Sequence, residues 1–153
     1  MKYVILSTDN NPDYYSLLPL VCHSWRKIGY TPVVLTVGLD ESIKVLIEQY
    51  CTVKTLPCGP EPGVKDSTLA QLWRLFMGRQ FEKGAVLITA DADMVIARDI
   101  FTHDVSQGQI VSYGFDLTGR SELPICYIKA TATKWRELIG EFIIPEKAYS
   151  ERW

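Results

Sequence analysis

Short apolar runs alternate with amphipathic stretches along the 153 residues of this chain. Continuous apolar runs are typical of strands buried on both faces, and apolar residues at every third or fourth position indicate helices. The expected strands cover residues 3–6, 32–37, 52–56, 85–90, 109–113 and 124–128, and the expected helices cover residues 17–28, 43–50, 68–77 and 133–139.

Polar residues and glycines mark where these elements begin and end. Ser16 is expected to cap the first helix, and Thr68 is expected to open the third helix in a capping box with Gln71. Gly29 is expected to end the first helix, because glycine readily takes the left-handed conformation found at such ends. Residues 94–97 are expected to form a short extended continuation after the strand over 85–90.

The alternation of strands and helices predicts a single α/β domain. Strand–helix–strand units of this length build a mostly parallel, twisted sheet with helices on both faces, which is a three-layer α/β/α arrangement. Ligands of such sheets bind outside the carboxyl ends of the strands. Functional residues are therefore expected directly after strands, with Ser7, Thr8 and Asp9 after the first and Asp91 and Asp93 after the fourth.

Composition and charge exclude several classes of protein. Hydrophobic residues make up 47% of the chain, charged residues make up 22%, and the net charge is -2, which excludes a disordered chain and a nucleic-acid-wrapping protein. No apolar run approaches the roughly 20 residues of a membrane span, and the N-terminal run is too short for a signal peptide. The cysteines form no C-x-x-C pair and are expected to be reduced thiols of a cytoplasmic protein: Cys22, Cys51, Cys58 and Cys126.

The strongest chemical signal is the D-x-D motif formed by Asp91, Ala92 and Asp93. Two carboxylates this close together at the end of a buried strand need compensation, because an unpaired buried charge is costly. Oxygen ligands favour Mg²⁺ or Mn²⁺, which keep waters and accept substrate phosphates as further ligands. The motif therefore predicts a Mg²⁺ or Mn²⁺ site at Asp91 and Asp93, and the alternative is a pair of solvated turn aspartates.

Around this motif the chain resembles the GT-A glycosyltransferases, which have a Rossmann-like fold. The resemblance rests on residues 66–76, a helix that bears Arg74, and on residues 85–93, the strand that ends in D-x-D. Small viral and bacterial members and glycogenin-like enzymes are the most similar in character. The resemblance implies metal-dependent transfer of a sugar from a nucleotide-diphosphate donor, with UDP as the expected nucleotide, to a glycan or other hydroxyl acceptor. A viral member would act in the host cytoplasm.

The resemblance also assigns residues to the phosphate side of the donor. Asp93 would bind the metal directly, and Asp91 would face both the metal and the ribose. Arg74 would pair with the D-x-D region or with the phosphates, and the alternative is an arginine on a solvated helix surface. Lys65, just ahead of the helix, would meet a phosphate or lie on the surface as an ordinary lysine.

On the nucleoside side, the resemblance points to the exit of the first strand. Ser7, Thr8 and Asp9 would hold the base and the ribose, since a carboxylate accepts hydrogen bonds from a uracil N–H or a ribose hydroxyl. The alternative for Asp9 is a turn-capping aspartate before Asn10.

The catalytic base and the acceptor site are the least defined parts of the prediction. Asp116 and Glu122 are candidate catalytic carboxylates, with solvated loop carboxylates as the alternative. Only 60 residues follow Asp93, and His103 comes too early to match the late metal ligand of the family. The chain is therefore expected to be a minimal enzyme, a piece of one, or one completed by a partner that supplies acceptor contacts.

Three other functions fit parts of the same pattern. Asp91 and Asp93 match the nucleophile and the acid/base of haloacid-dehalogenase-type phosphatases, but those enzymes carry the motif on their first strand and need a later lysine and acidic pair. A nucleotidyltransferase needs a glycine-rich, basic loop after the first strand, which residues 7–11 do not provide. A non-catalytic module that binds nucleotide sugars remains open.

Overall fold

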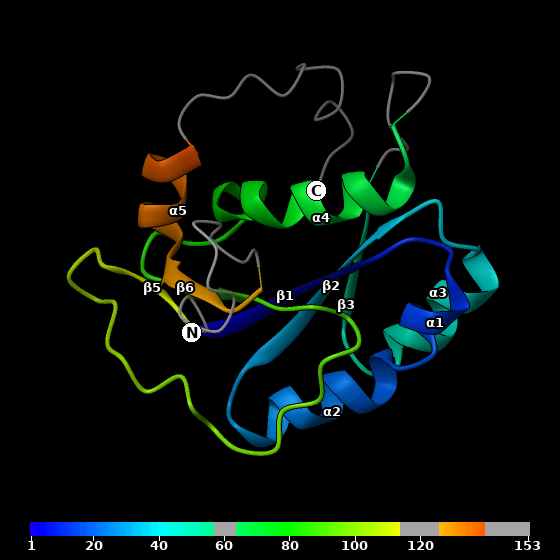
Figure 1. Cartoon of the computed structure of the whole chain (residues 1–153), viewed down its shortest axis with the longest axis horizontal. Helices are drawn as coiled ribbons and strands as arrows, with labels where there is room; N and C mark the ends of the chain where they lie inside the picture. The colour runs from blue at the N-terminus through cyan, green and yellow to red at the C-terminus, as the bar shows by residue number, and fades with distance from the viewer. Residues whose placement is uncertain (57–63, 114–125, 140–153) are drawn as a thin grey trace, which may run out of the picture.

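One twisted sheet with helices on both faces forms the frame of the protein (Figure 1). The computed structural model describes residues 1–56, 64–113 and 126–139. The strands are β1 (Lys2–Thr8), β2 (Thr31–Val37), β3 (Thr52–Leu56), β4 (Val86–Thr89), β5 (Ile110–Ser112) and β6 (Ile128–Thr131), and their order in the sheet is β3-β2-β1-β4-β6-β5. The predicted three-layer α/β/α fold is confirmed.

The sheet is parallel except at one strand. β1 pairs in parallel with β2 and β4, and β2 pairs in parallel with β3. β6 runs antiparallel to both β4 and β5. Because β1 and β4 are parallel neighbours, with Ile5 opposite Thr89, their carboxyl ends lie side by side at one edge of the sheet.

Two layers of helices bury the two faces of the sheet. On one face lie α1 (Pro12–Tyr15), α2 (Leu18–Lys27) and α3 (Glu41–Glu48), and on the other lie α4 (Asp66–Phe76), the short 3₁₀ helix η1 (Met77–Gln80) and α5 (Ala132–Ile139) (Figure 1). Alternate residues of β1 serve the two cores: Val4 packs with Trp25 of α2, whereas Ile5 packs in the cluster that contains Ala70 of α4. Among the described residues no helix is long and apolar enough to cross a bilayer.

Two predicted helix caps are wrong. Ser16 ends α1 instead of capping α2, because Asn11 and Pro12 form an earlier start in which the Asn11 side chain accepts from the backbone N–H of Asp13. Thr68 lies inside α4, which begins at Asp66 and has an acidic residue in its first turn, where it complements the helix dipole. The end predicted at Gly29 is confirmed by its φ of 85°.

Two predicted strands are also displaced. The strand expected over 124–128 is β6, which begins at Ile128 after a turn at residues 126–127, and residues 124–125 lie outside the described part of the chain. The structure assigns no strand to residues 94–97, which follow a turn at residues 92–93. β6 escapes the sequence pattern because it contains Lys129, whose buried amine donates to the carbonyls of Phe101 (2.6 Å) and His103 (2.7 Å). These two tertiary hydrogen bonds therefore offset the cost of burying a charge that the local sequence pattern predicts to be exposed.

The packing of α5 on η1 gives a test of the fold. We expect Gly78→Ala to lower the free energy of unfolding by about 1–3 kcal/mol, as overpacked sites do. A Cβ at Gly78 would lie 2.5 Å from the Trp135 Cβ, so one helix must shift. Urea unfolding measures the effect, and Gly84→Ala is the matched control because a Cβ there meets no atom within 4 Å. Equal stability of the two variants would contradict this packing.

Candidate functional site

A cavity of about 340 Å³ opens where the carboxyl ends of β1 and β4 meet. Its walls come from the exits of the two strands, from α1 and from one face of α4. The lining residues are Ser7, Thr8 and Asp9, Tyr14, Ser67, Ala70, Gln71 and Arg74, and Asp91, Ala92 and Asp93. The cavity lies at the edge of the sheet where ligands of such folds bind. The structure thus brings together the predicted residues of the two strand exits and the predicted arginine of α4.

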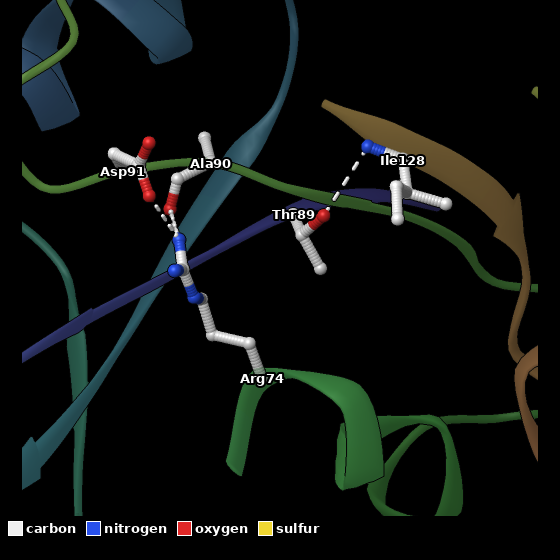
Figure 2. Close-up of polar contacts among 5 residues, drawn as sticks. All are labelled: Arg74, Thr89, Ala90, Asp91 and Ile128. Carbon is white, nitrogen blue, oxygen red and sulfur yellow. Dashed lines mark hydrogen bonds and ion pairs between the residues drawn. The ribbon is translucent and has the colours of Figure 1, made fainter. Parts of the chain in front are cut away.

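Arg74 reaches from α4 to the end of β4 (Figure 2). It is only 4% exposed, and its Nη1 donates to the Ala90 carbonyl and to Asp91 Oδ1, both at 2.6 Å. The alternative of a solvated surface arginine is therefore wrong. Figure 2 shows the second oxygen of the Asp91 carboxylate turned away from the guanidinium. One oxygen of Asp91 is thus fixed by Arg74, and the other is left for a ligand.

The cavity carries more negative than positive charge. Asp9, Asp91 and Asp93 line it, and Arg74 is the single cation among its lining residues. The Asp91 side chain is 41% exposed, and Asp93 is exposed. Within the described residues no cluster of three or more His, Cys, Asp or Glu side chains forms a metal cage. Asp91 and Asp93 nevertheless fit Mg²⁺ or Mn²⁺, because these ions take one or two protein carboxylates together with waters and phosphates.

The exit of β1 is shaped by local hydrogen bonds. Asp9 Oδ1 accepts from the Asn11 N–H at 3.2 Å, and Thr8 Oγ1 donates to the Asp9 carbonyl at 3.0 Å. Asp9 thus caps the turn with one carboxylate oxygen, which was the alternative prediction for this residue. The same residue also lines the cavity. Ser7 and Thr8 are buried, so only a small part of their polar surface faces the cavity.

One other predicted residue is not brought into the cavity. Lys65 is exposed at the N-cap of α4 and is absent from the lining. Asp116 and Glu122 lie outside the described residues.

Sequence reasoning missed Tyr14, Ser67 and Gln71. A signal for the two α4 residues exists, because positions 67, 71 and 74 share one helix face and carry polar side chains beside an apolar stripe. No local pattern points to Tyr14, which enters the lining only because α1 packs beside the exit of β1.

Cys126 and Tyr127 approach the D-x-D motif from the turn before β6. The Cys126 thiol lies near the Asp91 carboxylate, and burial, followed by the charge of Asp91, raises the pKa of this thiol. Burial, followed by the charges of Cys126, Asp91 and Asp93, raises the pKa of Tyr127 to about 12. The sequence indicated only an ordinary reduced thiol at Cys126. Its contact with Asp91 depends on a strand pairing that local patterns do not reveal.

Comparisons with known proteins bear on the fold. No protein-family model and no curated protein matches the sequence. Among solved structures, the galactosyltransferase LgtC in complex with donor and acceptor sugar analogs superposes with a TM-score of 0.62 at 13% identity, over 90% of this chain and 60% of LgtC. An active-site mutant of LgtC gives a TM-score of 0.64 at 12% identity, over 90% of this chain and 59% of that one.

A second solved protein has the same architecture. The glycosyltransferase GlyE of Streptococcus pneumoniae TIGR4 superposes with a TM-score of 0.54 at 13% identity, over 91% of this chain and 36% of GlyE. The chain thus spans less than two thirds of the length of either protein. At this identity the likeness concerns architecture and not activity. The chain has the GT-A fold of these glycosyltransferases.

Proposed function

We propose that this chain is a metal-dependent glycosyltransferase that takes its sugar from a nucleotide-diphosphate donor, with UDP-sugars as the favoured donors, and passes it to a hydroxyl acceptor. The observation that carries the proposal is the cavity that joins the D-x-D carboxylates, Arg74 and the exit of β1. The GT-A fold, found also in LgtC with donor and acceptor sugar analogs, supports it.

Charge explains why the donor needs a metal. A diphosphate is anionic, and the cavity presents three carboxylates against one guanidinium. Like charges held close together repel, so a cation is required for tight binding. Asp91 and Asp93 would hold Mn²⁺ or Mg²⁺, and the bound ion supplies positive charge that stabilises the departing diphosphate.

The residues of the chain bind and orient the donor. Arg74 holds Asp91 in one orientation through a hydrogen bond to Oδ1 and is itself anchored on the Ala90 carbonyl. Thr8 and Asp9 offer polar atoms for the ribose and the base. The acceptor oxygen attacks the anomeric carbon, the bond from this carbon to the diphosphate breaks, and the acceptor proton passes to a base. Asp116 and Glu122 remain the proposed candidates for that base.

Tyr14 is proposed to stack on the nucleotide base. Tyr14 is 41% exposed and lines the cavity together with Asp9. We expect Tyr14→Ala to weaken UDP binding by about tenfold, because base–aromatic stacking contributes roughly 1–3 kcal/mol per base. Tyr14→Phe should bind like the wild type. Calorimetry measures the effect, and the control is Tyr50→Ala, since Tyr50 is equally exposed but lines a different cavity. Unchanged UDP binding by Tyr14→Ala would show that Tyr14 does not stack on the base.

The phosphatase alternative is not favoured. The D-x-D motif follows β4 and not the first strand, and the solved structures found with this fold include LgtC and GlyE, which are glycosyltransferases.

Release of UDP from UDP-sugars tests the proposed reaction. With Mn²⁺ and no acceptor, we expect slow release of UDP and free sugar, because water replaces the acceptor hydroxyl. A suitable hydroxyl acceptor should accelerate the release. Donor binding without any release would indicate a binding module, and release of phosphate from a phosphomonoester would indicate a phosphatase.

A further inference from the structure

The turn that leads into β6 contains an unusual backbone conformation. Tyr127 has a φ of 59°, which makes it the one non-glycine residue in the left-handed region within the described part of the chain. A side chain with a Cβ disfavours this conformation, and such residues persist only where the surrounding structure holds them. They occur preferentially at functional sites, so the contacts that hold Tyr127 indicate what the turn does.

Thr89, the last residue of β4, holds this turn at two points. The Thr89 carbonyl accepts from the Tyr127 N–H at 2.6 Å. Thr89 Oγ1 accepts from the Ile128 N–H at 3.2 Å, as Figure 2 shows. On the other side, the Tyr127 carbonyl accepts from the Tyr113 N–H at 3.0 Å. Thr89 and Ile128 are buried, so water cannot replace a lost contact between them. The hydroxyl of Thr89 is thus part of what fixes the turn.

The pinned turn lies against the D-x-D motif. Thr89 precedes Asp91 by two residues, and the turn places the Cys126 thiol near the Asp91 carboxylate, whose charge acts on the thiol. Arg74 binds the same carboxylate from α4. Asp91 is therefore held by Arg74 and bordered by Cys126, and the place of Cys126 depends on the conformation that Thr89 imposes.

We propose that Thr89 is a positioning residue: by pinning the left-handed turn at Tyr127, it keeps Cys126 against Asp91 and so fixes the free oxygen of Asp91 toward its ligand. This role rests on the proposed function, because the ligand is the metal-bound donor. Thr89 acts through the turn and does not itself touch the donor.

The test compares two threonines that make the same kind of contact. Thr89→Val keeps the shape of the side chain but removes the acceptor for the Ile128 N–H, and Thr89→Ser keeps the hydroxyl. Thr131→Val is the matched control, because Thr131 Oγ1 likewise accepts a backbone N–H, from Lys134 at 3.2 Å, but lies opposite Val86 at the other end of β4. Both valine variants leave one N–H unsatisfied, so a general loss of stability affects both.

Two readouts separate positioning from stability. The first is UDP binding with Mn²⁺, measured by calorimetry well below the unfolding transition of each variant. We expect Thr89→Val to bind about tenfold more weakly, and Thr89→Ser and Thr131→Val to bind like the wild type. The second is the rate at which iodoacetamide alkylates Cys126, followed by mass spectrometry. We expect faster alkylation in Thr89→Val only, because release of the turn frees the thiol.

Wild-type affinity and wild-type alkylation in Thr89→Val would overturn the proposal, as would equal losses of affinity in the two valine variants. If the wild-type chain binds no nucleotide, the proposed function fails, and the role toward the donor fails with it. The alkylation rates still decide whether Thr89 fixes the turn beside Asp91.

Discussion

Asp93→Asn is expected to weaken Mn²⁺-dependent UDP binding by more than about 100-fold. Asp93 is the exposed carboxylate of the D-x-D motif, and an amide in its place removes one of the two negative charges that this motif offers a metal. Loss of an outer-shell partner alone costs about 10–100-fold in metal affinity, so loss of a direct ligand should exceed that range. Calorimetry with and without Mn²⁺ measures the effect.

Two matched substitutions sharpen this result. Asp91→Asn should weaken binding less, by about tenfold, because Asp91 is assigned to the ribose as well as the metal, and an amide still accepts a hydrogen bond from a ribose hydroxyl. Asp104→Asn should leave the affinity for UDP unchanged. Asp104 is an exposed aspartate that accepts hydrogen bonds from Ser106 and does not line the cavity. Wild-type affinity in Asp93→Asn would refute the assignment of the metal site.

Arg74→Met is expected to lower the free energy of unfolding by about 2–4 kcal/mol. The substitution leaves the buried Ala90 carbonyl without its donor, which costs roughly 1–3 kcal/mol, and removes the ionic partner of Asp91. Asp91 is partly exposed, so solvent limits the contribution of the ion pair to the lower end of its range. Urea unfolding measures the loss.

The matched control for Arg74→Met is Arg98→Met, because Arg98 is exposed on the loop that follows the D-x-D motif. It should alter stability by less than about 0.5 kcal/mol. Arg74→Lys should fall between the two, since an ammonium keeps the charge but not the planar donor geometry. An unchanged unfolding transition in Arg74→Met would mean that the arginine does not support the end of β4.

The sequence predicts best those elements whose stability is local in origin. β1, β2 and β4 are continuous apolar runs buried on both faces, and their positions are predicted to within one or two residues. β6 is displaced because Lys129 and Thr131 are buried by tertiary contacts that no local pattern contains. The cap predicted for α2 at Ser16 is wrong because Asn11 and Pro12 already begin a helix upstream, which Ser16 ends.

The residues of the candidate site likewise divide into those that the sequence predicts and those that depend on tertiary packing. The residues after β1 and β4 could be predicted because parallel neighbours end at one edge of the sheet, and the cavity is found there. Tyr14 and Cys126 could not be predicted, because Tyr14 reaches the site through the packing of α1 beside β1, and Cys126 reaches it through the pairing of β6 with β4. The buried state of Arg74 could not be derived from helical spacing, since it depends on the distance between α4 and the Ala90 carbonyl.

Calorimetric titration of UDP-glucose, UDP-galactose and GDP-mannose, with Mn²⁺ and again with EDTA, tests the central claim most directly. The proposed site predicts that at least one UDP-sugar binds in the presence of Mn²⁺, with a dissociation constant of about 1 µM to 1 mM as enzymes show for substrates. It also predicts that EDTA abolishes this binding, because three carboxylates then face the diphosphate with one guanidinium between them. Equal binding with Mn²⁺ and with EDTA, or no binding of any of these donors, would contradict a metal-dependent donor site at Asp91 and Asp93.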